Sequence, residues 1–420
     1  MSPKSKGRPK GRGRAQPKRR PPAAKEIGVV DRVLRGATRL SDLEDEVVVQ
    51  MLASSWVGLQ LADAGFRGRH PERSLAGAVA ERLTGEPGDA AYRALLALRT
   101  LTGPEDTAYI DELLAGHRHV LPAEPPWAHP SVPQPREAWR VSDPWGSEIS
   151  YVVAYDAPQP HELLAHVSTV GGLLVSETGL VQPGYVHELA GYLGEDAEAI
   201  EPGEALARIH DAITMTDLYF PPMWGPESAE ARSVVLARAR PYAVEHGAPP
   251  IADDARRELL DAFALHAAQV VPSVPAEVVE VLADTFIDFG DGYLPGGVLA
   301  WSPGEVERFL LDWVLRKVVL DPADWQALPD VLAAWVEFAL RRRNLDEDDI
   351  AVVVATVGEL TPEFRDAAGD ESSFGPGAQV LRALQAQGAD LTDRAALEQA
   401  VRAYNAGRLA EIAFEGQQQE

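Results

Sequence analysis

Hydrophobic residues recur every three or four positions along most of the chain, which is the spacing that buries one face of an α-helix. An early example follows the segment 41–44, which has the form of a capping box, and ends near Gly65. Its apolar positions are Leu43, Val47, Met51, Leu52, Trp56 and Leu59. The pattern predicts further short helices near 72–83, 88–101 and 105–116, separated by glycine and proline.

Helical spacing returns from about residue 202 onward. Ser302 is the predicted N-cap of one helix, and Pro303 suits its first turn because the missing amide hydrogen is not needed there. A broad apolar face follows from Val306 to Val314, and a second helix carries Trp335 and Leu340. The spacing also predicts helices over 346–358, 376–387 and 393–405.

The period changes to two between these helical regions. Ile149, Tyr151, Val153 and Tyr155 alternate with smaller residues, which is strand spacing. Turn residues at 143–146, 156–160 and 171–172 separate this segment from its neighbours. We therefore expect a four-stranded antiparallel meander over about 138–181. Such a small sheet needs helices on one face to be stable.

These patterns indicate a helix-dominated α+β fold with a helical N-terminal region, a small antiparallel β-meander and a larger helical C-terminal region. The predicted organisation is a disordered arm at 1–25, a helical domain at 26–120, a proline-rich linker at 121–137, a sheet region at 138–200, a helical domain at 201–412 and a frayed tail at 413–420.

The chain has no cysteine, which excludes disulfides, thiolate metal sites and a thiol nucleophile. No apolar run reaches the roughly 18–20 residues that a membrane helix needs. The basic N-terminus is not followed by the apolar segment of a secretory signal. We therefore expect a cytoplasmic protein with no membrane partner.

Charge is divided sharply along the chain. Residues 1–25 contain ten Lys or Arg and no Asp or Glu. The other 29 of the 39 basic residues and all 64 acidic residues lie in the body, so the body carries −35 and the arm +10. The arm should be attracted to a polyanion that the body repels, or it should fold back on the body.

The arm contains a motif that resembles an AT-hook. That family places a Gly-Arg-Pro core with basic flanks in the minor groove of A·T-rich DNA, where arginine suits the strongly negative potential. Here a lysine precedes the glycine where that family usually has arginine. The resemblance implies DNA contacts by Lys6, Gly7, Arg8, Pro9, Lys10, Arg12 and Arg14. Nonspecific binding of DNA or RNA remains an alternative.

Three carboxylates near one helix end form the second candidate. Asp284 and Asp288 share a helix face, and Asp291 follows close by. Carboxylate oxygens are preferred ligands of Mg²⁺ and Ca²⁺. The tripeptide at 288–290 is similar to a kinase metal-binding tripeptide, but the glycine-rich loop and catalytic loop of a kinase are missing. A helix end with solvated acidic residues is the alternative.

The remaining motifs have structural explanations. His161 and His166 lie around the third predicted strand without zinc spacing, so they suit hydrogen-bonded sheet positions. Three arginines at 341–343 end a predicted helix, where cations favour the helix dipole. The apolar, proline-broken segment 218–225 suits a plug for the core, or else an exposed patch for a partner.

The sheet and the C-terminal helices, above all the stretch 301–343, resemble uncharacterised proteins of high-GC actinobacteria, which implies no activity. The sequence contains no nucleotide-binding loop and no nucleophile elbow, and no cofactor is predicted. We therefore expect a non-enzymatic interaction protein whose arm contacts nucleic acid and whose acidic body contacts protein. An enzyme with an unfamiliar carboxylate or metal site is the alternative.

Overall fold

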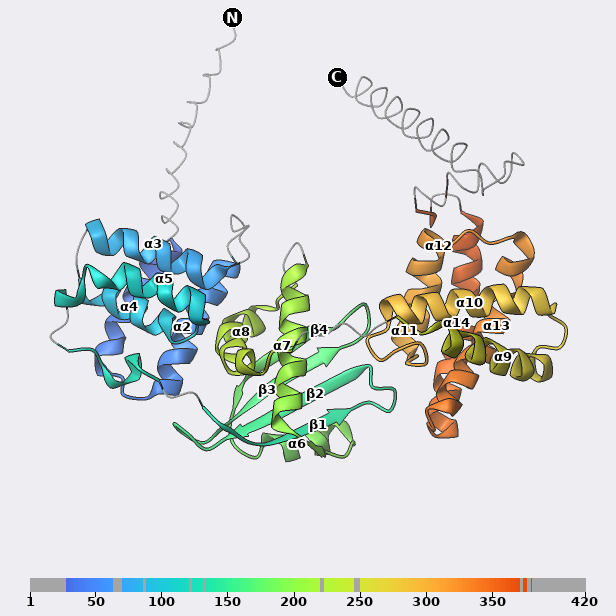
Figure 1. Ribbon diagram of the computed structural model, residues 1–420, viewed down its shortest axis with the longest axis horizontal. Coiled ribbons are helices and arrows are strands. Elements are labelled where there is room, and N and C mark those ends of the chain that lie inside the picture. The colour runs from blue at the N-terminus through green and yellow to red at the C-terminus, as the bar shows by residue number, and fades with distance from the viewer. Residues whose placement is uncertain are drawn as a thin grey trace, which may run out of the picture.

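The computed structural model describes residues 28–62, 70–85, 88–120, 123–130, 133–219, 223–244, 250–370, 373–375 and 379. N-terminal helices, a central sheet and a C-terminal helical bundle follow one another across the molecule in chain order (Figure 1). The fold is helix-dominated α+β, as the sequence predicts. The predicted arm at 1–25, the predicted helices at 376–387 and 393–405 and the predicted tail at 413–420 lie outside the described residues, apart from Gln379.

The N-terminal helices form where the periodicity predicts them. They are α1 (Val29–Ala37), α2 (Glu46–Leu61), α3 (Pro71–Gly85), α4 (Asp89–Arg99) and α5 (Pro104–Ala115), with short 3-10 turns η1 (Thr38–Asp42), η2 (Arg118–Val120) and η3 (Pro126–Ala128).

The predicted capping box of the α2 helix is wrong. Its N-cap is Asp45, whose side chain accepts from the Val48 amide at 3.1 Å. Ser41 and Asp42 belong to η1, and Leu43 has extended backbone, so the helix cannot begin there. Both Ser41 and Asp45 have side chains of the kind that caps a helix. The helix begins after Asp45 because the η1 turn occupies the residues around Ser41.

The sheet confirms the predicted meander and adds one strand. Its strands are β1 (Pro135–Ser142), β2 (Glu148–Tyr155), β3 (His161–Ser168), β4 (Leu174–Val181) and β5 (Glu198–Ile200), in the order β4-β3-β2-β1-β5 with antiparallel neighbours. The three residues of β5 are too few to show an alternating pattern, so the sequence did not reveal this strand. The β1 strand begins inside the predicted linker.

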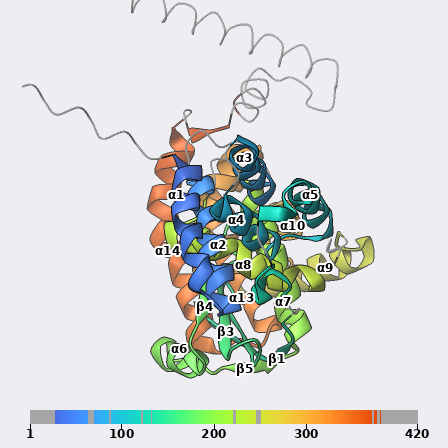
Figure 2. The ribbon, with the colours of Figure 1, turned by 90° about the vertical axis from the view of Figure 1, so that its left-hand side faces the viewer.

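Helices cover both faces of the sheet, whereas the sequence predicted cover on one. Tyr151, Val153 and Tyr155 of β2 belong to the core shared with α7 (Pro202–Leu218) and α8 (Pro226–Ala239). Val152 points to the other face and packs with Val186 of α6 (Tyr185–Leu193). Figure 2 shows α6 beyond the strands, on the side away from α8. Both sets of alternating β2 side chains are therefore buried.

One hydrophobic core joins the N-terminal helices, the sheet, α7 and α8, and extends to Ala239. We call this unit the first body; it ends with the 3-10 turn η4 (Arg240–Tyr242). The sequence placed a division at residue 200, but α7 and α8 both pack on β4, and α8 also packs on the α2 helix. The two large cores therefore separate near residues 244–250.

The second body is helical and has its own core. Its helices are α9 (Asp253–Val270), α10 (Ala276–Tyr293), α11 (Pro303–Arg308), the π-helical turn η5 (Phe309–Trp313), α12 (Val314–Lys317), α13 (Pro322–Arg342) and α14 (Glu347–Gly369). The predicted N-cap is confirmed, because the Ser302 hydroxyl accepts from the Glu305 amide at 3.3 Å. Phe286, Trp301, Phe309 and Trp335 are fully buried at its centre. Across the described ranges, no helix has both the length and the apolar composition of a membrane span.

Replacing Gly58 with alanine is expected to destabilise the first body by about 1–3 kcal/mol through overpacking. A β-carbon at Gly58 would lie 2.7 Å from the Glu230 Cα, because α2 and α8 approach closely there. Gly191 in α6 is the control, since a β-carbon there meets nothing within 4 Å. The G191A change should stabilise by about 0.5–1 kcal/mol. Urea unfolding of both variants measures the difference, and equal effects would contradict close α2–α8 packing.

Candidate functional site

The predicted nucleic-acid contacts cannot be placed. Lys6, Gly7, Arg8, Pro9, Lys10, Arg12 and Arg14 all lie outside the described residues.

The three candidate metal ligands have protein partners. The Arg256 guanidinium of α9 lies between two of them, with Nη2 at 2.5 Å from Asp284 Oδ1 and 2.7 Å from Asp288 Oδ1. Asp291 accepts from the Ile251 amide at 2.8 Å. A cation therefore does sit between Asp284 and Asp288, but it is a side chain that ties α9 to α10. Within the part of the chain that the structure describes, no three His, Asp or Glu side chains are grouped to hold a metal ion.

A line of hydrogen bonds crosses β2 and β3 on the face that α6 covers. Ser150 Oγ lies 2.8 Å from His166 Nδ1, and His166 Nε2 lies 3.1 Å from Glu148 Oε2. Ser168 Oγ donates to Glu148 Oε1 at 2.6 Å. Burial alone would raise the pKa of Glu148, but the bonds from His166 and Ser168 hold it below its ordinary value. His166 thus occupies the hydrogen-bonded sheet position that the sequence favoured.

The side chains of Ser150, His166 and Glu148 contact one another as in a nucleophilic catalytic triad. The site lacks the other features that such a triad requires. Ser150 is only 1% exposed and lies in the middle of a regular strand. Strand pairing occupies the neighbouring backbone amides, which an oxyanion hole would need. The arrangement therefore serves to fix the pairing of β2 with β3.

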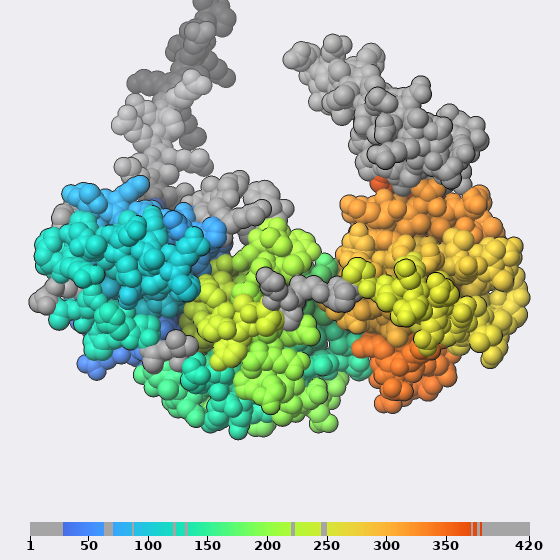
Figure 3. All heavy atoms as spheres, in the orientation of Figure 1, coloured from blue at the N-terminus to red at the C-terminus, as the bar shows by residue number. Residues whose placement is uncertain are grey.

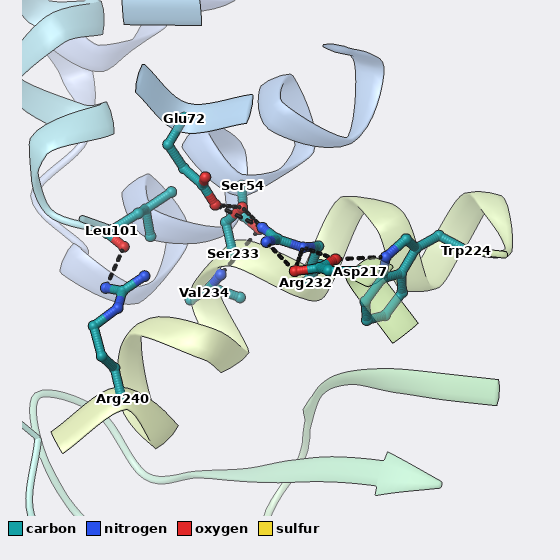
Figure 4. A network of polar contacts seen from close by, with 9 residues as sticks. All are labelled: Ser54, Glu72, Leu101, Asp217, Trp224, Arg232, Ser233, Val234 and Arg240. Atoms are coloured by element: carbon teal, nitrogen blue, oxygen red, sulfur yellow. Dashed lines mark hydrogen bonds and ion pairs between the residues drawn. The ribbon is translucent and has the colours of Figure 1, made fainter. Parts of the chain in front are cut away.

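A buried arginine network holds three helices of the first body together (Figure 4). Arg232 of α8 lies between Asp217 at the end of α7 and Glu72 at the start of α3, at 2.5 Å and 2.7 Å. The Ser233 hydroxyl donates to the same Glu72 oxygen, and the Trp224 indole donates to Asp217. Every nitrogen of the Arg232 guanidinium has a partner.

The electrostatics of this network favour the ionised pair. Burial by itself would raise the pKa of Glu72, but Arg232 and Ser233 bring it below its ordinary value. Burial would likewise lower the pKa of Arg232, whereas Glu72 and Asp217 raise it. All of these charges stay in place at neutral pH, so the network is a fixed structural tie that leaves no group free for proton transfer.

A second buried arginine on α8, Arg238, makes no ion pair with a carboxylate of the described residues, although Glu46 at the start of α2 is close enough to act on its charge. Arg238 Nε donates to His161 Nε2 at 3.3 Å, and its Nη1 donates to the Val234 carbonyl of its own helix. His161 Nδ1 lies 2.7 Å from the Gln159 carbonyl and so carries the proton of the neutral ring. Tyr155 stacks on His161 at 5.0 Å. Burial lowers the pKa of both His161 and Arg238, the latter to about 10.

Two polar atoms of this cluster lack hydrogen-bond partners among the described residues, namely the Arg238 Nη2 and the Tyr155 hydroxyl. Their residues are at most 5% exposed. Side chains from α8, β2 and β3 therefore hold the Arg238 charge away from solvent, and Glu46 of α2 acts on it only from beyond ion-pair distance. Burying the Arg238 charge therefore costs free energy and lowers the stability of the first body.

A shallow pocket of about 570 Å³ lies between α7 and the segment that follows α8. Gly203, Glu204 and Arg208 of α7 form one side, and Pro241 and Tyr242 of the segment after α8 form the other. Its two charged side chains have opposite sign, so its lining favours neither an anion nor a cation.

The apolar segment 218–225 is only partly a core plug. Trp224 packs against the first core, as the favoured prediction required. Leu218 and Met223 are instead 61% and 57% exposed, which is closer to the alternative of a surface patch. The three residues between 219 and 223 lie outside the described residues.

The arginines at 341–343 have different roles in the structure. Arg341 pairs with Glu337 and Glu347, while Arg343 is the C-cap residue of α13 and donates to the Trp145 carbonyl of the first body at 2.8 Å. Helix capping therefore accounts for only part of this cluster.

Searches against protein families, curated proteins and solved structures found no match for this chain.

No pattern in the sequence predicts the two buried arginines of α8. Arg232 stands 160 residues from Glu72, and Arg238 stands 77 residues from His161. An arginine in an alanine-rich helix is ordinarily a surface residue, so only the assembled helices reveal these contacts.

Proposed function

We propose that this protein is a non-enzymatic interaction protein that binds nucleic acid through residues 1–25 and a protein partner through its acidic body. The main support for this proposal is the division of charge along the chain, which is +10 in the arm and −35 in the body. Nonspecific affinity for nucleic acid comes from cations that replace counterions at the phosphates. The body cannot supply this attraction at long range because its net charge has the same sign as the phosphates.

The surface position of the first described helix supports this role. Gly28, which precedes α1, is exposed, so the arm joins the body at its surface. Protein groups form hydrogen bonds with Asp284, Asp288 and Asp291. No specific observation therefore favours the alternative of an enzyme with a carboxylate–metal site. A cytoplasmic location belongs to the same proposal.

Deleting residues 1–25 is expected to abolish binding to A·T-rich duplex DNA at 50 mM salt. For the intact chain, about six phosphate contacts would reduce affinity roughly 10³-fold between 50 and 200 mM salt. Fluorescence anisotropy of both proteins across salt measures this. Equal weak DNA binding by the two proteins would refute the proposal. Tight DNA binding by the protein that lacks residues 1–25 would refute it as well.

Two single substitutions separate a minor-groove hook from general charge attraction. R8Q and R20Q each remove one positive charge, but only Arg8 lies in the Gly-Arg-Pro core. A hook predicts that R8Q loses at least about tenfold more affinity than R20Q on A·T-rich DNA, with little difference on G·C-rich DNA. Equal losses on both duplexes would assign the arm to nonspecific binding.

A further inference from the structure

The two bodies meet through turns. Among the described residues, no helix or strand of the first body makes more than marginal contact with a helix of the second. The second body lies beside one end of the sheet in Figure 1, and in Figure 3 its yellow and orange atoms lie next to the green atoms of the first body. The β1–β2 and β3–β4 turns both lie at that end, because the strands are antiparallel. A junction of this size leaves relative motion of the two bodies as the default expectation.

The β1–β2 turn anchors the junction with a tryptophan. Trp145 packs against the core of the second body, and its indole donates to the Asp349 carbonyl at the start of α14 at 3.2 Å. Its own carbonyl accepts from Arg343 at the end of α13. One residue of the first body, through its side chain and its backbone, thus bridges two helices of the second.

The β3–β4 turn lies against the start of α11. A β-carbon on Gly304 would come within 2.9 Å of the Val170 side chain, so the Gly304 backbone lies directly against that side chain. The Thr169 amide donates to the Ser147 carbonyl at 2.8 Å, which ties this turn to the β1–β2 turn. The two turns therefore form one docking surface, here called the turn pair (residues 143–147 and 169–172).

A carboxylate is buried at this contact. Glu305 of α11 is 1% exposed, and neither of its carboxylate oxygens completes a hydrogen bond of good geometry. Arg308, one turn along, lies 3.6 Å from Oε2, and the Gly171 backbone of the turn pair is its other polar neighbour. An ionised carboxylate in this position is poorly compensated for its lost water.

Few charges surround Glu305. Residues 169–172 of the turn pair have no titratable side chain, and Asp143 in its other turn lies near Arg343 of α13. Further along the sheet, Glu148 and His166 bond to one another. On the second body, the half-buried Asp349 of α14 and Tyr293 of α10 are nearby ionisable groups, and Arg308 lies over the Tyr293 ring. Burial raises the pKa of Glu305 to about 7, although Arg308 lowers it somewhat.

We propose that Glu305 is a proton-controlled latch between the two bodies, which strengthens their docking when its carboxyl is protonated and weakens it when ionised. Separation of the bodies would return the side chain to water and its pKa toward the ordinary 4.5. The docked state then binds the proton more tightly, so docking is strongest below about pH 4.5, weakens as the pH rises to about 7, and stays weak above that.

Energy transfer between two dyes tests this latch in the full chain. Because the chain has no cysteine, E188C on α6 and E363C on α14 supply two labelling sites at exposed positions. A urea titration at each pH measures undocking even where the docked state dominates, and far-UV circular dichroism distinguishes it from unfolding. The docking equilibrium constant is expected to fall on the order of 10- to 100-fold between pH 5 and pH 8.

Three variants make the result decisive. E305Q keeps a neutral side chain of the same size and should dock equally well at both pH values. E307Q is the matched control, since Glu307 is exposed on the same helix, and it should retain the pH dependence. W145A should reduce transfer at every pH. A parallel pH dependence in E305Q would overturn the latch, and unchanged transfer in W145A would overturn docking through the turn pair.

Discussion

Replacing Arg232 with methionine will lower the free energy of unfolding of the first body by about 3–5 kcal/mol at pH 7. The change leaves Glu72 buried without its cation and removes the partner that holds Asp217. Removing one member of a buried pair costs more than the pair contributes, because the remaining charge has neither water nor a partner. The α3 helix, which is distant in sequence, loses its tie to α7 and α8 at once.

Urea unfolding at pH 7 and pH 4 measures the loss. The low pKa of Glu72 in the native protein contributes stability that is present above about pH 4.5 and disappears as the pH falls through the native pKa. The deficit of R232M should therefore narrow at pH 4, where the isolated carboxylate can take up a proton.

R82M is the matched control for this loss. Arg82 pairs with Asp31 at the surface, with both side chains nearly half exposed. The expected cost is under about 1 kcal/mol. The variant that replaces both Glu72 and Arg232 with methionine should regain much of the R232M loss. A loss in R232M no larger than in R82M would show that the network carries no stability.

Replacing Arg238 with methionine will have the opposite sign, a stabilisation of about 1–2 kcal/mol. Arg238 lies on the same helix and is as buried as Arg232, but none of the described carboxylates forms an ion pair with it, and Glu46 acts on it only from farther away. A native pKa of about 10 against an ordinary 12.5 corresponds to roughly 3 kcal/mol of cost for holding the charge at neutral pH. Losing the hydrogen bond to His161 costs about 1–2 kcal/mol, which offsets part of this gain in stability.

The two substitutions serve as controls for one another in the same urea experiment. Both replace a buried guanidinium on α8 with the same thioether, so changes in helix propensity and volume nearly cancel. The main difference is that Arg232 has two carboxylates at ion-pair distance, whereas Glu46 acts on Arg238 only from farther away. A destabilisation of R238M equal to that of R232M would show that Arg238 is compensated in the native state.

The sequence determined the elements that depend on near neighbours. Ser302 and Pro303 specify a helix start through groups within three residues, and the alternation from Ile149 to Tyr155 specifies a strand through the pleat of the chain itself. The helix-dominated α+β class follows from such local patterns, and so does the charge division, since charge can be counted without a structure.

Only the tertiary structure decided what the buried charges do. Arg232 and Arg238 stand six residues apart in one helix, yet one meets two carboxylates and the other a neutral histidine. Glu305 has the sequence context of an ordinary first-turn glutamate, but the turn pair of the first body buries it. Coulomb energies and desolvation depend on distances across the fold, and spacing along the chain does not contain those distances.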